Sequence, residues 1–225
     1  MTESSTASLP LPLALPLPNG WDTGLLEPVA EINERLLECL QRRALGLRLL
    51  GPAAEEPAAE EPADEEPAAA QHRWPPLLRA LPAEWCALGA TGCSLQQLAA
   101  CPYLLLDASL YSRRDATASA EYFPGPEGVA LLRRALVFAW HVARCNRVVA
   151  RVVLGVGGRT LERMAAWRLQ ELDALAEGAH AWAVPRWPAQ PAIWRALLLA
   201  ARRGVPGQLR QLQLRGLQLM AAQPS

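Results

Sequence analysis

Apolar residues recur along most of this chain at the three- and four-residue spacing of one face of a helix. Between residues 24 and 50 they occupy positions 29, 32, 36, 37 and 40, and Pro28 suits a first helical turn. The same spacing continues from residue 127 onward, where it predicts helices over about 128–154, 159–167, 169–178, 190–203 and 207–221. The pattern therefore predicts an all-α fold, a helical bundle.

Residues 74–126 combine short apolar pieces with a polar loop. The pieces WPPLLRAL, AEWCALGA and SLQQLAAC predict three short helices, with Ser94 as the N-cap of the third. The apolar run CPYLLLDASLY, residues 101–111, is compatible with a strand or a helix. Its helical neighbours and the lack of a partner strand favour a helix. The loop that follows ends in Pro-Gly-Pro and separates this region from residues 127–225.

Two segments of biased composition flank the first predicted helix. Residues 1–23 are rich in proline and small polar residues, which predicts a disordered N-terminus. Residues 51–73 contain a Glu-Glu-Pro-Ala-Ala repeat in which regular prolines block a helix and like charges repel, so we expect an acidic linker. This tract could also act as a nucleic-acid mimic or a partner-binding arm, but a spacer is the commoner role. Residues 24–50 would then be an isolated helix.

The net charge of zero hides an uneven distribution. Seven of the 22 acidic residues lie between Glu55 and Glu66, whereas residues 127–225 hold fourteen arginines and five acids. Every basic side chain other than the three histidines is an arginine. A basic C-terminal part suits an anionic partner, although a solvated arginine face is the commoner meaning of such a composition.

The sequence contains no recognisable catalytic or metal-binding set. Its five cysteines form no Cys-x-x-Cys motif, and no histidine completes a zinc pattern with them. The histidines also lack the spacing of a catalytic triad, so we predict a protein that is not an enzyme and holds no cofactor or metal. The Pro-Leu alternation near the N-terminus is unlike a signal peptide, and no apolar stretch reaches the length of a membrane span. We expect a cytoplasmic protein without membrane contact.

The segment from Ala150 to Trp187 has the form of a helix, a glycine turn and an arginine-rich helix, as in a helix-turn-helix. Gly155 can adopt the positive φ of a sharp helix end, and Thr160 is a candidate cap for the next helix. Leu161 and Met164 would pack inward. The candidate DNA-binding residues on the outward face are Arg159, Arg163 and Arg168. Arg151 departs from the motif, because a tight helix crossing requires a small residue at that position.

Residues 131–222 resemble FlhD, the helical subunit of the flagellar master transcriptional activator. The resemblance rests on these motifs in that family's order: VFAWHV at 137–142, Ala150, Leu154-Gly155-Val156, Leu169, Leu172, Leu175, Ala176, Glu177 and Arg186-Trp187. It implies an all-helical, dimerising transcription factor that acts with a second regulatory subunit. Ala183 replaces a family cysteine that can link subunits, so no such disulfide is implied. Residues 1–126 have no counterpart in that family.

Two functions are therefore expected. The first is a transcriptional regulator subunit or other DNA-associated regulatory protein that acts as a homodimer. The alternative is a helical adaptor that binds other proteins without touching nucleic acid. Two apolar stripes on the last helix are typical of a helix buried on both sides, as in a dimer. The residues expected in the core or dimer interface are Leu154, Gly155, Leu169, Leu172, Leu175, Leu209, Leu212 and Leu219.

Overall fold

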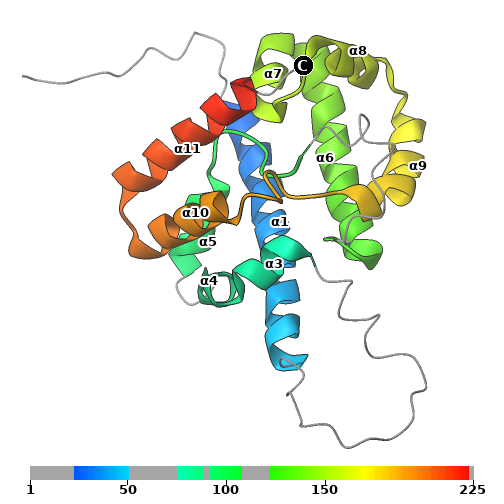
Figure 1. Ribbon diagram of the computed structural model, residues 1–225. Helices are drawn as coiled ribbons and strands as arrows, with labels where there is room; N and C mark the ends of the chain where they lie inside the picture. The colour runs from blue at the N-terminus through cyan, green and yellow to red at the C-terminus, as the bar shows by residue number, and fades with distance from the viewer. Residues whose placement is uncertain (1–22, 51–74, 89–91, 108–121, 223–225) are drawn as a thin grey trace, which may run out of the picture.

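The regular secondary structure of this protein is helical throughout the residues that the structure describes. The computed structural model describes residues 23–50, 75–88, 92–107 and 122–222, which confirms the predicted all-α class for those ranges (Figure 1). The predicted disordered N-terminus and acidic linker lie outside them, apart from Thr23 at the start of the first helix. Within the described ranges, no helix combines the length and apolar character of a membrane span.

Helix α1 (Thr23–Leu50) lies at the centre of the molecule (Figure 1). It packs against α4 (Pro82–Leu88), α5 (Gly92–Ala99) and α6 (Gly125–Cys145). The apolar face recognised in the sequence is buried in these contacts, through Val29, Ile32, Leu36, Leu37 and Leu40. The prediction of an isolated helix was therefore wrong, because that face is buried by helices that follow the predicted linker.

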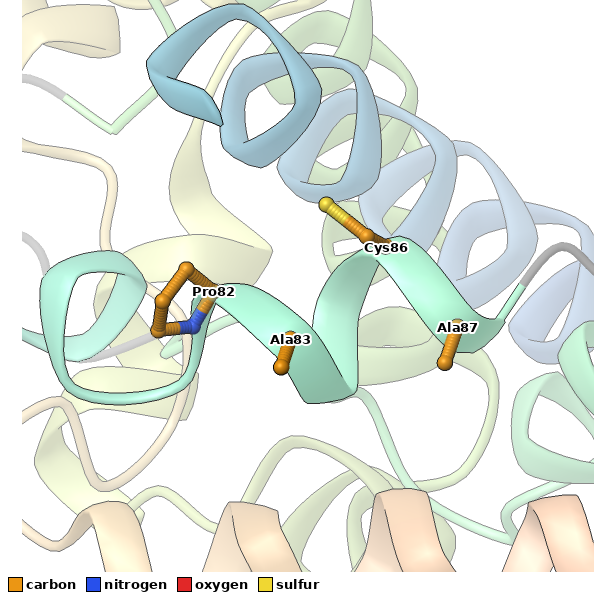
Figure 2. A pocket seen from close by; sticks show the side chains of 4 residues that line it. All are labelled: Pro82, Ala83, Cys86 and Ala87. Atoms are coloured by element: carbon orange, nitrogen blue, oxygen red, sulfur yellow. The ribbon is translucent and has the colours of Figure 1, made fainter. Parts of the chain in front are cut away.

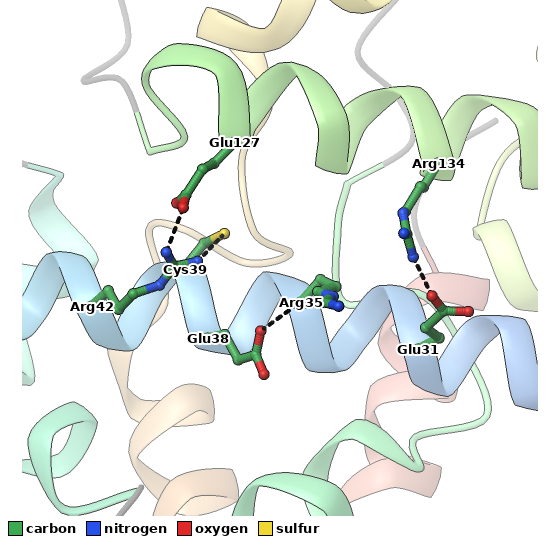
Figure 3. A network of polar contacts seen from close by, with 7 residues as sticks. All are labelled: Glu31, Arg35, Glu38, Cys39, Arg42, Glu127 and Arg134. Atoms are coloured by element: carbon green, nitrogen blue, oxygen red, sulfur yellow. Dashed lines mark hydrogen bonds and ion pairs between the residues drawn. The ribbon is translucent and has the colours of Figure 1, made fainter.

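Ion pairs join α1 to α6 at the edge of this packed face. Arg42 on α1 lies 2.5 Å from Glu127, and Arg134 on α6 pairs with Glu31 (Figure 3). All four side chains are more than half exposed. Since exposed pairs typically contribute no more than about 1 kcal/mol each, these contacts orient the two helices and add little to stability.

The three predicted short helices are present as α3 (Pro76–Ala80), α4 and α5. Helix α5 begins at Gly92, so Ser94 lies within its first turn and is not the N-cap that we predicted. Trp85 on α4 packs against Trp194 on α10 (Pro191–Arg203) in a tilted arrangement, with ring centroids 5.3 Å apart and planes at 43°. Both indole rings are fully buried, so they link the first half of the chain to the second.

The described part of the apolar run 101–111 has no helix, which corrects the prediction for that segment. Leu106 forms an isolated antiparallel bridge with Pro185, and the amide of Leu104 donates to the carbonyl of Val153 at 3.0 Å. Pro102 disfavours helical geometry at the residue before it. The backbone groups of this segment bind distant parts of the chain in place of an i→i−4 ladder.

Asn33 on α1 forms hydrogen bonds that hold residues 99–105 in place. Its side-chain amide donates to the carbonyls of Ala99 and Tyr103, at 3.2 and 2.9 Å, and its oxygen accepts the amide of Leu105 at 2.8 Å. The side chain is fully buried. These three bonds satisfy the polar groups of a buried asparagine and hold residues 99–105 against α1.

The long helix predicted over 128–154 is divided into α6 and α7 (Arg147–Leu154). Asn146 separates them with an extended backbone, φ −150°, and its side-chain oxygen accepts the amide of Val149 at 3.1 Å. This is an ordinary N-cap, and apolar spacing alone did not reveal it. The remaining helices agree with the predicted bounds to within one residue, apart from the short 3-10 turn: α8 (Gly158–Ala166), α9 (Leu169–Ala179), η2 (His180–Trp182), α10 and α11 (Pro206–Ala221).

Candidate nucleic-acid interface

A glycine turn joins α7 to α8. Gly155 has φ 59° and ψ 36°, the left-handed geometry that favours glycine, and its amide donates to the carbonyl of Arg151 at 2.9 Å. The sequence predicted this positive φ. Helix α8 then begins at Gly158 with Gly157 as its N-cap. Thr160 lies inside the helix, so the prediction that it would cap α8 was wrong.

A buried guanidinium lies against this turn. Arg186 is only 3% exposed, and it donates from Nε to the carbonyl of Leu104 and from Nη2 to the carbonyl of Leu154, the last residue of α7. Its own carbonyl accepts the indole N–H of Trp194 at 2.6 Å. Burial lowers the pKa of Arg186, and the charge of Asp107 opposes that shift. Arg186 therefore joins three segments of the chain and is not available to a ligand.

Helix α8 presents opposite faces to the core and to solvent. Leu161 and Met164 are 2% and 1% exposed, whereas Arg159 and Arg163, one turn apart, are exposed. Leu161 and Met164 therefore point inward and the two arginines point outward, as the sequence predicted. Helix α8 packs on both α6 and α7 (Figure 1). Because Arg151 is exposed, the position where a helix-turn-helix requires a small residue does not lie between packed helices, so the pair lacks that motif's close crossing.

Arg168, the third candidate DNA-binding arginine, lies close to the end of α6 through contacts made by Trp140 and Trp167. Arg168 is exposed and precedes α9, and its amide donates to the carboxylate of Glu171 at 2.8 Å. The preceding carbonyl, of Trp167, accepts the indole N–H of Trp140 at 2.9 Å. The guanidinium of Arg144 lies over the Trp140 ring, 4.9 Å from its centroid. Arg144 and Arg168 therefore belong to one region of the surface.

The described surface carries both paired and unpaired arginines, and the exposed unpaired ones outside this region are Arg79, Arg202, Arg203, Arg210 and Arg215. Arg35, Arg42, Arg133, Arg134 and Arg195 each pair with a carboxylate. We use the name basic end for a set of exposed arginines on α7, α8 and the start of α9 that form no ion pair with any described residue: Arg147, Arg151, Arg159, Arg163 and Arg168. Acids of the described first half, such as Glu31 and Glu84, pair with arginines elsewhere.

The leucines predicted for the core or dimer interface differ in burial. Leu154 and Leu172 are fully buried and Leu209 is 6% exposed, so all three belong to the core of a single chain. Leu175, Leu212 and Leu219 are partly buried and pack against that core. Leu169 is 59% exposed, so it is not a core residue. It follows Arg168 directly and lies beside the basic end.

A second surface feature offers no comparable chemistry. Helix α4 carries a hollow of about 320 Å³ lined by Pro82, Ala83, Cys86 and Ala87 (Figure 2). The Cys86 side chain points toward α1, and Ala83 and Ala87 project from another side of the helix (Figure 2). These four side chains provide no charged group to orient a polar ligand.

Sequence reasoning missed the two polar residues that organise this end of the molecule, Arg186 and Asn33. Asn33 lies on the apolar face of α1, between Ile32 and Leu36, where a buried polar residue implies a buried acceptor or donor. Comparison of the chain with models of known families, with curated proteins and with solved structures finds no match. Function has to be inferred from the chain's own residues and their geometry.

Proposed function

We propose that this chain is a non-enzymatic, DNA-associated regulatory protein that acts as a helical dimer in the cytoplasm and contacts DNA through its basic end. The observation that carries the proposal is that Arg159, Arg163 and Arg168 are exposed without a carboxylate partner among the described residues. Guanidinium groups suit phosphate oxygens and guanine edges, and phosphate contacts supply most non-specific DNA affinity.

The resemblance of residues 131–222 to FlhD supports the regulatory part of this proposal. It adds a homodimer and a second regulatory subunit as expected partners. The exposed large apolar side chains that a protein contact could cover include Leu169, 59% exposed, and Leu214, 52% exposed. A second copy that covers Leu214 on α11 would leave the arginines of the basic end, on α7 to α9, free for DNA.

A salt titration tests the proposal directly. The purified full-length chain, alone and with any co-purified partner, is titrated with labelled duplex fragments at several salt concentrations. If the five arginines of the basic end each neutralise one phosphate, the logarithm of the binding constant should fall with the logarithm of salt with a slope of about −4.5 per chain. Absence of binding at low salt, in both preparations, would overturn the proposal.

The alternative, a helical adaptor, is favoured by one specific observation. Val148 is 73% exposed next to Arg147, and Leu169 is 59% exposed next to Arg168, so an exposed apolar side chain follows an exposed arginine at two places in the basic end. Such a mixture is also typical of protein interfaces, where arginine is enriched. The adaptor would capture a protein partner with an affinity that depends on Val148 and Leu169, and it would show no salt-dependent DNA binding.

A further inference from the structure

One thiol and one imidazole lie together on the exposed side of α6. His141 and Cys145 are four residues apart, so their side chains share a face of the helix. The Cys145 Sγ lies 3.7 Å from Nε2 and 3.9 Å from Nδ1 of His141. Both side chains are exposed. Neither residue belongs to the basic end.

The separation of these atoms matches what a tetrahedral zinc ion requires of two ligands. With a Zn–S distance of about 2.3 Å and a Zn–N distance of about 2.0 Å, tetrahedral ligands lie roughly 3.6 Å apart. The observed sulfur–nitrogen distances are 3.7 and 3.9 Å. Because the sulfur is almost equidistant from the two nitrogens, the imidazole ring would turn so that one nitrogen faces the ion. Ligands at positions i and i+4 of a helix are a recognised way to hold zinc.

A single chain supplies only half of such a site. Within the described residues, no group of three or more histidine, cysteine, aspartate or glutamate side chains is placed to hold a metal. Structural zinc needs four ligands. We propose that His141 and Cys145 form a zinc half-site, and that a second copy of this chain completes it as a shared Cys2His2 centre.

A second thiolate favours a second copy over water as the source of the missing ligands. Zinc bound by one thiolate and one neutral imidazole keeps a net positive charge. The thiolate of a second copy would make the centre neutral. A second copy would also bury apolar area at Val137, which is 39% exposed and one turn before His141 on α6.

This proposal shares only the dimer with the proposed function. Failure to bind DNA would leave the metal site untouched, and failure to bind metal would leave DNA binding by the basic end untouched. The two ideas are therefore separated by measuring metal binding without nucleic acid.

Cobalt(II) is the probe, because it takes zinc's place in tetrahedral thiolate sites and absorbs visible light. The full-length chain is stripped with a chelator, kept reduced with a phosphine and titrated with Co²⁺, then with Zn²⁺. We expect sulfur-to-cobalt charge-transfer bands that saturate at one ion per two chains, and zinc should displace the cobalt. Sedimentation equilibrium should show the dimer fraction rising with metal and falling with chelator.

Variants at the two ligands provide the decisive comparison. Cys145→Ser and His141→Ala should each weaken binding by more than about 100-fold, since loss of an outer partner alone costs about 10- to 100-fold. The control is Cys86→Ser, a partly exposed thiol on α4, which should bind like the wild type. Circular dichroism checks that all three fold. Saturation at one ion per chain without a change in mass, unchanged binding in Cys145→Ser, or no binding at all would each overturn the shared site.

Discussion

Gly155 and Arg186 are in direct contact across the turn between α7 and α8. A Cβ atom placed on Gly155 would lie 3.0 Å from Nη1 of Arg186 and 3.0 Å from the sulfur of Met220 on α11. A buried cation and the last helix therefore occupy the space that a side chain at Gly155 would need. The glycine is required for two separate reasons, its left-handed backbone and the absence of space for a side chain.

The first prediction separates these two reasons. Gly155→Ala should destabilise the protein by about 2–3 kcal/mol, because left-handed geometry costs an L-residue roughly 1–2 kcal/mol and the added methyl group also crowds Arg186. Gly204→Ala is the matched control, since Gly204 has φ 62° and a Cβ atom added to it would meet nothing within 4 Å. It should lose only about 1–2 kcal/mol. Urea denaturation measures both, and equal losses would show that the contact with Arg186 is unimportant.

The second prediction concerns the hydrogen bonds of Arg186. Arg186→Met should lower the free energy of unfolding by about 2–5 kcal/mol, because each buried carbonyl left without a donor costs about 1–3 kcal/mol. The carbonyls affected are those of Leu104 and Leu154. Arg195→Met is the control: its guanidinium is exposed and pairs with Glu84 at 2.9 Å, so the loss should stay below about 1 kcal/mol. Similar losses in the two variants would contradict a structural role for Arg186.

The third prediction uses the close approach of α11 to Tyr103. A methyl group at Gly216 would overlap the Tyr103 hydroxyl and lie 2.9 Å from Cη2 of Trp187. Gly216→Ala should therefore cost about 1–3 kcal/mol through overpacking. Tyr103→Phe removes a buried hydroxyl that has no hydrogen-bond partner among the described residues, so on its own it should be nearly neutral.

A double-mutant cycle tests whether the two residues are coupled. In the Tyr103→Phe background, Gly216→Ala should cost at least about 0.5 kcal/mol less than in the wild type, because part of the overlap has been removed. Chemical denaturation of all four proteins supplies the comparison. Strict additivity would mean that α11 does not approach Tyr103 as closely as the structure has it.

The helices after residue 157 could be predicted closely because glycine and proline mark their ends. Pro191 begins α10, and Gly204 with Pro206 separates it from α11. The break at Asn146 was missed because apolar residues keep helical spacing on both sides, from Val142 to Val149. Nothing in that periodicity distinguishes one helix from two. The capping side chain of Asn146 was the available signal.

The candidate site could be predicted in part. The exposed positions of Arg159 and Arg163 follow from the inward positions of Leu161 and Met164, since the alternation is local to one helix. The role of Arg186 does not follow from the sequence, because the carbonyls it binds belong to residues 82 and 32 positions away. Knowledge of the tertiary fold is needed before a basic residue can be recognised as a buried anchor.

The fourth prediction concerns alkaline pH. Burial raises the pKa of Cys101 from its ordinary 9.0 to about 12, and burial also raises the pKa of Tyr103. Both groups stay protonated in the folded chain while the unfolded chain loses protons. Stability should therefore be fully present below about pH 9 and fall above it, by about 1.4 kcal/mol per pH unit for each such group.

Two variants separate these groups. Cys101→Ala should flatten the loss of stability between pH 9 and 10, where the Cys101 thiol of the unfolded chain ionises first. Tyr103→Phe should leave that range nearly unchanged and flatten the loss above pH 10, the ordinary pKa of tyrosine. Urea denaturation at stepped pH values gives the curves. A wild-type stability that does not change between pH 8 and 10.5 would contradict the buried, protonated state of Cys101.

The last prediction compares two pairs of arginines in DNA binding. The double variant Arg159→Gln, Arg163→Gln removes two unpaired guanidinium groups, so its affinity should fall for every DNA sequence. The slope of the logarithm of the binding constant against the logarithm of salt should become shallower by about 1.8, which is about 0.9 for each lost phosphate contact. Arg35→Gln with Arg42→Gln removes the same charge from α1, where both arginines are about half exposed and pair with Glu38 and Glu127. That control should retain the wild-type slope. If both double variants lose affinity equally, binding reflects overall charge, and the basic end has no special role. If only the first loses affinity, the basic end of α7–α9 is the surface that meets the phosphates.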